Sequence, residues 1–357
     1  MNHRFPLLAP ALLALLPGSV MPALAQYTYH ALPPTPDLPN DSTVSTWTSG
    51  INNLGQVAGY EIDPTGNHFV VVWTNDVPVK LPLPDGDKFV FGNIEINDSG
   101  QVLTNLSSGT TGVPVLWTNG VPAVVPPGPN PCVPASASSM AIDLNNLGHV
   151  LGLTKAGTCV TYWIWNGQQF HVVQPPLLPG CAATTFSAVA VNNHDDVLGI
   201  LPAPTCPVTG QLLPIVIHAD GTFHFYAVPT GFTATAVQSI NDAGQANGTA
   251  NDSHGVGVAL LWSSPTAAAE VIRSPKIRQF QPVPGKLNRE GDFILTTGND
   301  AGAHPYLFHS GSLTALDQQG LIYPNSGGPV NNTFGFAITG EVEGNYQWPR
   351  GLRGQFY

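Results

Sequence analysis

Four side chains that could bind a polar ligand share one position in a recurring sequence pattern. Each stands directly before an aliphatic residue that is followed by asparagine, and the four are Glu95, Asp143, Ser239 and Lys286. The other occurrences of the pattern hold Gly50, Ala190 and, less regularly, Pro329. If they converged, two carboxylates, a hydroxyl and an ammonium could bind a small polar ligand or an ordered ion, and the carboxylates would titrate above their ordinary values. Alternatively, each group is solvated or hydrogen-bonded locally.

No catalytic, cofactor or metal motif accompanies these four residues. The histidines form no H-E-x-x-H pattern, and no G-x-S-x-G is present to anchor a hydrolase triad. The segment Asn97–Gly100 has one acidic residue, whereas calcium loops need several at alternate positions. We therefore predict no catalytic residue, no cofactor and no metal site.

The pattern itself belongs to an internal repeat of about 47 residues. Each copy begins with an aliphatic residue, asparagine, a second residue that is usually Asn or Asp, a variable residue and usually glycine. The leading asparagines are Asn52, Asn97, Asn145, Asn192, Asn241 and Asn288, and a weaker seventh copy begins at Asn331. Tandem repeats of this length are typical of solenoids and propellers.

Each repeat is predicted to form four short antiparallel strands. The Asn-Asx-x-Gly segment is a hairpin turn, in which Asx side chains bond to the turn's own backbone and glycine takes a positive φ. Asp195 replaces that glycine in the fourth copy, and Asp tolerates this conformation. The third strand ends in an aromatic residue, and the series is Trp73, Trp117, Trp165, Trp262 and Phe308, with His218 in the fourth copy. We expect the four tryptophans to pack in the core, and a sugar-stacking platform is the alternative. A second turn, such as Asn119-Gly120, leads to a fourth strand that often ends at proline.

These features predict an all-β protein, a β-propeller with seven four-stranded blades in a single domain over residues 26–357. Six blades, or an open β-solenoid or sandwich, are the alternatives. Residues 27–33 match a fourth strand, whereas the chain ends near Trp348–Tyr357, where a third strand is expected. The N-terminal strand would therefore complete the last blade and close the ring, which removes exposed sheet edges. The first strand of each unit would be innermost, so the four candidate side chains would meet at one mouth of the central channel.

The repeats resemble those of the HAF-repeat family of extracellular bacterial proteins. The family's Ile-Asn-Asp-x-Gly-Gln-Val-x-Gly core is similar to Ile51–Gly59 and Ile96–Leu103, and its His-Ala-Phe-Leu-Trp strand is nearest to His304–Phe308. That strand has drifted elsewhere, as at Val113–Trp117. The resemblance extends over nearly all of residues 27–357 and implies export and a repeated β fold, but no activity.

Four cysteines can form disulfides if the chain is exported, and they are Cys132, Cys159, Cys181 and Cys206. Of the three possible pairings, the repeat favours one, because each pair then stands at matching distances before and after a leading asparagine. We predict Cys132–Cys159 and Cys181–Cys206, each contributing roughly 3 kcal/mol in the chain-entropy treatment. A metal site would need a C-x-x-C or a histidine at ligand spacing, and neither is present.

Residues 1–25 are predicted to be a signal peptide. Arg4 supplies a positive charge, Leu7–Val20 is apolar, and Ala23–Ala25 is a small-x-small cleavage site, so the mature chain would begin at Gln26. A membrane anchor is the alternative, but the apolar stretch is short and interrupted by prolines. We expect a secreted or periplasmic protein that keeps no membrane span after cleavage.

The charge of the chain restricts its partners. It has 11 Lys and Arg against 22 Asp and Glu, for a net charge of −11. A nucleic acid needs clustered basic residues, so it is not an expected partner. We predict a scaffold or binding module for an extracellular protein or a glycan. The alternative is an extracellular propeller enzyme on a polysaccharide, a glycoside hydrolase or lyase, which needs two or more carboxylates near the ring axis.

Overall fold

The computed structural model describes twelve segments of the chain. They are residues 27–40, 43–84, 89–108, 111–131, 138–177, 186–202, 212–273, 282–299, 302–316, 330–332, 335–340 and 350–356. The predicted signal peptide over residues 1–25 lies outside them, as do Pro329, Cys132, Cys181 and Cys206. Within these segments the protein consists of strands and connecting turns, with no helix.

Six sheets have four antiparallel strands each, and we number them blades 1 to 6 along the chain. Blade 1 contains β2 (Ser45–Ile51), β3 (Val57–Ile62), β4 (His68–Thr74) and β5 (Val77–Lys80). Blade 2 contains β6 (Phe89–Ile96), β7 (Val102–Ser108), β8 (Thr111–Thr118) and β9 (Val121–Val124). Blade 3 contains β10 (Ser138–Leu144), β11 (Val150–Ala156), β12 (Cys159–Trp165) and β13 (Phe170–Val173).

The second half of the ring repeats this plan. Blade 4 contains β14 (Ser187–Val191), β15 (Val197–Pro202), β16 (Leu212–Ile217) and β17 (Phe223–Phe225). Blade 5 contains β18 (Phe232–Ile240), β19 (Ala246–Asp252), β20 (Gly257–Trp262) and β21 (Glu270–Ile272). Blade 6 contains β22 (Val283–Pro284), β23 (Phe293–Asn299), β24 (Gly302–His309) and β25 (Ser312–Ala315). A three-stranded sheet, the closing sheet, has the order β1 (Tyr27–Ala31), β27 (Arg350–Phe356) and β26 (Gly335–Gly340).

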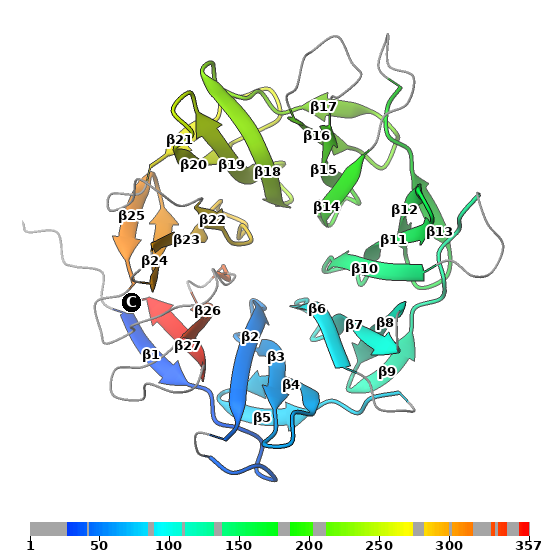
Figure 1. Cartoon of the computed structure of the whole chain (residues 1–357), viewed down its shortest axis with the longest axis vertical. Coiled ribbons are helices and arrows are strands. Elements are labelled where there is room, and N and C mark those ends of the chain that lie inside the picture. Colours follow the sequence, from blue (N-terminus) through cyan, green and yellow to red (C-terminus); the bar gives the residue numbers. More distant parts are fainter. Residues whose placement is uncertain are drawn as a thin grey trace, which may run out of the picture.

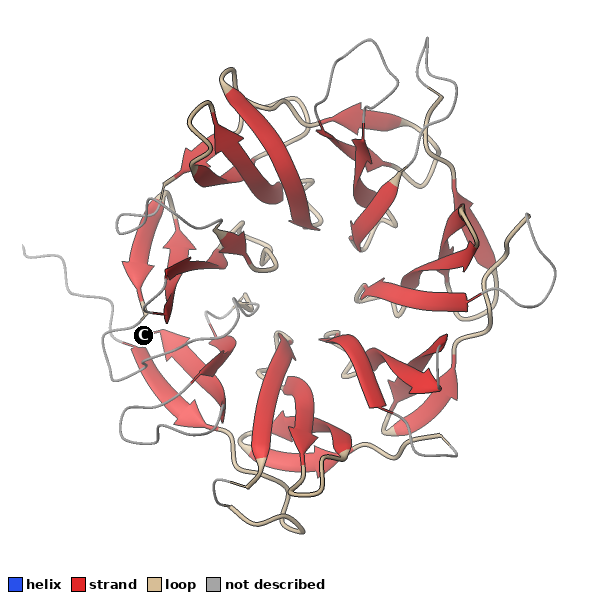
Figure 2. Cartoon of the chain, in the orientation of Figure 1, coloured by secondary structure: helices blue, strands red, loops and turns tan. Residues whose placement is uncertain are grey.

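The sheets stand around an open centre, with the first strand of each blade innermost and the fourth outermost (Figure 1). Figure 2 shows that strands account for the regular structure all around this ring. The prediction of an all-β propeller with an inner first strand is therefore confirmed. We predicted seven four-stranded blades, and the described residues form six. The closing sheet has three strands in the described residues.

The N-terminal strand closes the ring, as the sequence predicted. β1 pairs antiparallel with β27 in a register that runs from Tyr27 opposite Phe356 to Ala31 opposite Leu352. The chain that follows β1 is fastened to blade 1, because Trp73 Nε1 donates to the carbonyl of Pro33 at 2.8 Å. Thr35 donates from its backbone N–H and its hydroxyl to the buried carboxylate of Glu61, at 2.8 and 2.7 Å. The first and last parts of the chain thus hold each other in place.

The turn predicted from Asn-Asx-x-Gly forms as expected in the six regular copies. In blade 1, Gly55 N–H donates to the carbonyl of Asn52, and Oδ1 of Asn52 accepts from the N–H groups of Leu54 and Gln56. Gly55 has a φ of 74°, and Asp195 takes a φ of 61° at the same place in the fourth copy. The interpretation of Asp195 as a tolerated substitute is confirmed.

The core lies between neighbouring sheets. Trp73, Trp117 and Trp262 are at most 1% exposed, so the expectation of core packing is confirmed for them. In the third copy Trp165 is partly buried and the fully buried indole is that of Trp163, two residues earlier on β12. Because side chains alternate along a strand, Trp163 lies on the same side of the sheet as Trp165 and fills this part of the core.

In the fourth copy, the residue at the tryptophan position lies one residue earlier than the repeat spacing predicted. Strand pairing places Trp73 opposite Val57, Trp117 opposite Val102 and Ile217 opposite Val197. The tryptophan position of blade 4 therefore holds Ile217, and the assignment of His218 to it was wrong. The loop that precedes this strand is longer in the fourth copy, so residue spacing alone misplaced the position.

The two predicted disulfides stay predictions, because each includes at least one cysteine outside the described residues. Cys159 is not a free thiol, and the other three cysteines lie outside the described residues. The sulfur of Cys159 is 3.6 Å from Oδ1 of Asn130, which is two residues before Cys132 in the sequence. This contact favours the pairing Cys132–Cys159. Among the described residues, none belongs to a helix that could cross a membrane.

Candidate functional site

The leading asparagines of the repeats form a closed ring of hydrogen bonds around one end of the central channel. Each donates from Nδ2 to the backbone carbonyl of the leading asparagine in the next copy. The N–O distances run from 2.9 to 3.3 Å through Asn52, Asn97, Asn145, Asn192, Asn241, Asn288 and Asn331, and the last donates back to Asn52. The buried amide thus satisfies its own turn through Oδ1 and binds the neighbouring sheet through Nδ2. Only the first of these two roles is predicted by the sequence of the turn.

A second set of bonds lies one residue further along each copy and is incomplete. The N–H of Asn53 donates to Asp98 Oδ1 at 2.9 Å, and that of Asp98 donates to Asn146 Oδ1 at 2.9 Å. Asp242 accepts from Asn193 in the same way, at 2.8 Å. Arg289 occupies the next position and has no acceptor on its side chain, so the series breaks between Asp242 and Arg289. This edge of the channel is therefore uneven, although the asparagine ring beneath it is regular.

A β-bulge precedes three of the four candidate side chains, Glu95, Asp143 and Ser239. The pairing of β10 with β11 shifts between Ala141 and Asp143, and that of β6 with β7 shifts between Phe91 and Glu95. The same shift occurs before Gly50, Ala190 and Ser239 in their strands. An extra residue in one strand re-aims the side chain that follows it.

The glycine that recurs in the second strand is explained by this bulge. Gly59 pairs with Thr48, the last residue before the shift, and a Cβ on Gly59 would lie 1.8 Å from the carbonyl oxygen of Trp47. Gly248 stands at the same place in blade 5, where a Cβ would lie 2.4 Å from the carbonyl oxygen of Ala236. The repeat therefore keeps glycine where the bulged inner strand approaches its neighbour most closely.

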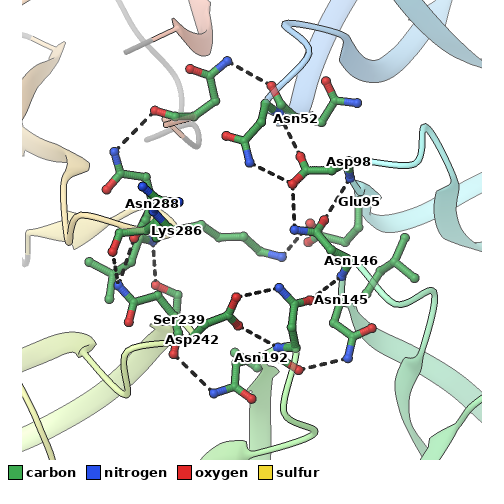
Figure 3. A pocket seen from close by; sticks show the side chains of 18 of the residues that line it. Asn52, Glu95, Asp98, Asn145, Asn146, Asn192, Ser239, Asp242, Lys286 and Asn288 are labelled. Atoms are coloured by element: carbon green, nitrogen blue, oxygen red, sulfur yellow. Dashed lines mark hydrogen bonds and ion pairs between the residues drawn. The ribbon is translucent and has the colours of Figure 1, made fainter. Parts of the chain in front are cut away.

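Lys286 reaches across the channel mouth to two carboxylates from other blades. Its Nζ is 2.7 Å from Oε2 of Glu95 (Figure 3). It also donates to Oδ1 of Asp143. Lys286 follows the short inner strand of blade 6, whereas Glu95 and Asp143 belong to the inner strands of blades 2 and 3. Three charged residues predicted as channel-mouth candidates thus converge, although they are far apart in the sequence.

Burial and charge together set the protonation of this group. Burial raises the pKa of Glu95 above its ordinary value, the Lys286 ammonium opposes this increase, and the Asp143 carboxylate adds to it. For Lys286, burial by itself lowers the pKa, but the carboxylates of Asp143 and Glu95 outweigh it and hold the pKa above its ordinary value. Lys286 is therefore charged at neutral pH, whereas Glu95 has an increased tendency to hold a proton.

The carboxylates of Asp143 and Glu95 differ in the number of hydrogen bonds that they accept. Asp143 accepts from the N–H of Leu144 through Oδ1 and from the N–H of Val191 through Oδ2, both at 2.9 Å, in addition to its bond with Lys286. Glu95 accepts one bond, from Lys286, and its Oε1 has no hydrogen-bond partner among the described residues. Asp143 is thus partly a structural residue that links blades 3 and 4, whereas Glu95 keeps an acceptor available to the channel.

Ser239 lines the same cavity but does not contact the charged group. Its hydroxyl donates to Oδ1 of Asn247 at 3.0 Å and accepts from the N–H of Leu287 at 2.8 Å. Its role is therefore to connect blades 5 and 6. Gly50 and Ala190 line the cavity with no polar side chain, and Pro329 lies outside the described residues.

The cavity at this mouth has a volume of about 460 Å³ and is lined by both sets of repeat residues together with the four candidates. Its side chains include the carboxylates of Glu95, Asp98, Asp143 and Asp242, and the cations of Lys286 and Arg289. Its size falls in the range of small-molecule sites, and its lining is more polar than most of them. No cluster of three or more His, Cys, Asp or Glu side chains in the described segments is arranged to hold a metal ion.

Known structures share the fold of this chain. The sequence matches no protein-family model and no curated protein. An oligogalacturonate lyase in complex with manganese superposes with a TM-score of 0.60 at 11% identity, over 94% of this chain and 98% of the lyase. The β-propeller domain of the Trilobed protease from Pyrococcus furiosus, described as having an open velcro topology, gives 0.59 at 10% identity, over 87% and 93%. A puromycin-hydrolysing peptidase from Mycobacterium tuberculosis gives 0.56 at 12% identity, over 90% of this chain and 56% of the peptidase. These similarities establish the propeller fold, which both a lyase and peptidases use.

Proposed function

We propose that this protein is an exported binding module that holds a small polar ligand at the mouth of its central channel. The observation that carries the proposal is the convergence of Glu95, Lys286 and Asp143 from three different blades on one polar cavity. Buried charges are expensive to desolvate, and a hydrophobic cluster of similar size would stabilise the fold at least as well. A charged group that the fold does not require for stability is a candidate for recognition.

The available hydrogen-bonding groups suggest the class of ligand. An ammonium has three protons, and Lys286 uses two of them on described residues. Oε1 of Glu95, which belongs to the carboxylate bonded to Lys286 Nζ, is an acceptor with no partner among the described residues. A donor and an acceptor side by side suit a hydroxyl or amide group, which both donates and accepts. We infer that the ligand is rich in such groups, as a glycan is.

A second candidate function is supported by the same convergence. An extracellular enzyme that cleaves a polysaccharide needs carboxylates close together near the ring axis, and Glu95 and Asp143 both bond to one nitrogen. The raised pKa of Glu95 suits a general acid. Against this stands the ammonium between the two carboxylates, together with the structural bonds of Asp143. We therefore place binding first.

Three further properties are proposed together with the function. The protein is secreted or periplasmic and belongs among the HAF-repeat proteins, which the quoted motifs support. The closing sheet counts as the seventh blade of the ring, and the closed series of leading asparagines, from Asn52 through Asn331 and back, supports this assignment.

The experiment that tests the function is a screen of the mature chain on a glycan and protein-ligand array, followed by two variants. Glu95→Gln removes the available carboxylate with little change in shape, and Glu270→Gln makes the same change at an exposed position of the outer strand β21. We expect ligands that bind the parent and Glu270→Gln but not Glu95→Gln. Release of new sugar ends from a bound polysaccharide would favour the enzyme instead. Equal binding by all three proteins would contradict a site at the channel mouth.

A further inference from the structure

Tryptophans fill the seams between blades in a repeated way. At three seams, the tryptophan near the end of the third strand donates from Nε1 to a carbonyl that follows the outer strand of the preceding sheet. The three pairs and their N–O distances are Trp73 to Pro33 at 2.8 Å, Trp117 to Pro82 at 2.7 Å and Trp262 to Ala227 at 2.7 Å. Each such seam is thus a slot for an indole ring, with apolar walls and one acceptor at its end.

The seam between blades 3 and 4 has the slot but no indole. Its tryptophan position holds Ile217, because Ile217 pairs with Val197 as Trp73 pairs with Val57. Isoleucine is shorter than tryptophan and has no side-chain donor. This substitution leaves the space and the acceptor of the slot without the group that uses them elsewhere.

The acceptor of this slot is the backbone carbonyl of Gln174. In two of the other seams, the accepting residue directly follows the residue that bonds to the third position before the tryptophan position of its own sheet. Leu81 donates to the carbonyl of Val70 and precedes Pro82, and Tyr226 donates to the carbonyl of Pro214 and precedes Ala227. At this seam the equivalent residue is Val173, which pairs with Tyr162, three residues before Trp165 on β12, and Gln174 comes next. No hydrogen bond to the Gln174 carbonyl is made by the described residues.

A cavity of about 400 Å³ lies at this seam, within the size range of small-molecule sites. Its apolar walls include Ile164, Val173, Val197 and Ile217, and Gln174 is part of its lining. Ile164, Val197 and Ile217 are buried among the side chains of the same core cluster. The cavity thus lies at the edge of this apolar core and includes the residue whose carbonyl is equivalent to the indole acceptors of the other seams.

Hydrogen bonds hold the rim of the slot in place. His218, on the rim, is 2.8 Å through Nδ1 from Oδ1 of Asp196 and 3.1 Å through Nε2 from Nδ1 of His224. Asp195, also on the rim, is 2.9 Å from Nδ1 of His149 in blade 3. A ligand entering here would meet an ordered opening, which limits the entropic cost of binding.

We propose that this slot binds a small planar aromatic molecule of the indole type, which carries a ring N–H donor. The ring would lie against Ile217 and Val173, and its N–H would donate to the Gln174 carbonyl. The three indoles of this same chain that occupy the equivalent slots define the shape and the hydrogen bond. This second site is separate from the channel mouth and does not depend on the function proposed there. The same ring could arrive free or as the tryptophan side chain of a partner.

The test is a titration of the mature chain with indole and with benzothiophene, followed by calorimetry and saturation-transfer NMR. Benzothiophene has the shape of indole but no N–H. We expect indole to bind and benzothiophene to bind about three- to ten-fold more weakly, as the loss of one hydrogen bond implies. N-acetyltryptophan amide, titrated in parallel, separates the two sources, because its binding shows that the slot accepts a tryptophan side chain and its failure restricts the slot to free molecules. Failure of both rings to bind overturns the proposal.

Variants locate the binding. Ile217→Trp supplies the missing indole and should abolish indole binding, whereas Val79→Trp adds the same side chain at a position that is 55% exposed and should leave binding unchanged. Ile217→Phe fills the slot in part and should weaken binding about ten-fold, which keeps the test informative if the tryptophan does not fit. Unchanged binding by a folded Ile217→Trp or Ile217→Phe variant would show that the indole lies elsewhere.

Discussion

Two positions that lie two residues apart in every repeat behave in opposite ways. The leading asparagine is the same in all copies and donates to the backbone carbonyl of the next copy in each, as Asn97 and Asn145 illustrate. The position two residues before it varies in type, and there Glu95, Asp143 and Lys286 meet in a charged group that no single repeat contains. The asparagine that all copies share holds the ring together. The position that differs between copies holds charged groups that are not required to form the ring.

The seams between blades give the same contrast. Where tryptophan recurs, the seam is packed and its carbonyl is satisfied, as with Trp262 and Ala227. Where Ile217 replaces tryptophan, a cavity results. Both candidate sites of this protein therefore arise where one repeat departs from the others.

The largest effect should come from breaking the shared ring itself. Deleting Gln26–Pro33 removes the partner of β27 and the acceptor of Trp73 Nε1, and it leaves an unpaired sheet edge. We expect this truncated protein to aggregate or to melt at least about 10 °C below the parent, as measured by light scattering and calorimetry. A monomeric protein with an unchanged melting temperature would show that the N-terminal strand does not close the ring.

A single leading asparagine should have the next largest effect. Asn145→Ala removes donor bonds to the Asn192 carbonyl and to Asp195, and acceptor bonds from the N–H groups of Leu147 and His149. We expect a loss of about 2–4 kcal/mol in the free energy of unfolding by urea titration. The adjacent and exposed Asn146 is the matched control, and Asn146→Ala should cost less than about 1 kcal/mol. Similar losses for both variants would remove the distinction between the two sets.

The charged group should be sensitive to the loss of its cation. Lys286→Met leaves the carboxylates of Glu95 and Asp143 without a counter-ion. Breaking a buried ion pair costs roughly 3–5 kcal/mol, and we expect about 2–4 kcal/mol here because 35% of the Lys286 side chain is exposed. Lys155→Met, at an exposed position on β11, should cost little. Equal stability of the two variants by urea titration would show that the three charges are not coupled.

The raised pKa of Glu95 predicts a pH dependence of stability. A carboxyl whose pKa is raised above its ordinary value of 4.5 contributes stability that is fully present below that pH and is lost as the pH rises through the folded-state pKa. Relative to Glu95→Gln, the parent should therefore be most stable in acid and lose this advantage toward neutral pH. Melting temperatures of both proteins over about pH 4 to 8 test this, and a parent that gains stability relative to the variant as the pH rises would reverse the sign.

The sequence predicted the repeated part of this structure well. The turn at Asn52–Gly55, the strand order and the closure by β1 follow from local residue preferences and from the repeat, which acts like an internal alignment. It also placed Glu95, Asp143 and Lys286 at one channel mouth, because equivalent positions of a ring point to the same axis. It could not show that Lys286 extends across the mouth to blades 2 and 3, since that depends on side-chain length and on the width of the channel.

The remaining differences have physical causes as well. The bulge before Asp143 leaves no signature in the residues of the inner strand itself, and the bond from each asparagine to the next copy appears only when the ring is closed. The slot at Ile217 was missed because a longer loop shifted the alignment of the fourth copy onto His218. The glycine at Gly59, required by the approach of the Trp47 carbonyl, was the one sequence signal of the bulge.

The most direct test of the account is the affinity of one array-selected ligand for the parent, Glu95→Gln and Glu270→Gln, measured by calorimetry at a single pH. If the channel mouth is the binding site, the dissociation constant rises at least about ten-fold for Glu95→Gln, the factor that one charged hydrogen bond supplies, and stays within two-fold for Glu270→Gln. Affinities that are the same for all three proteins would show that the charged group at the channel mouth takes no part in binding.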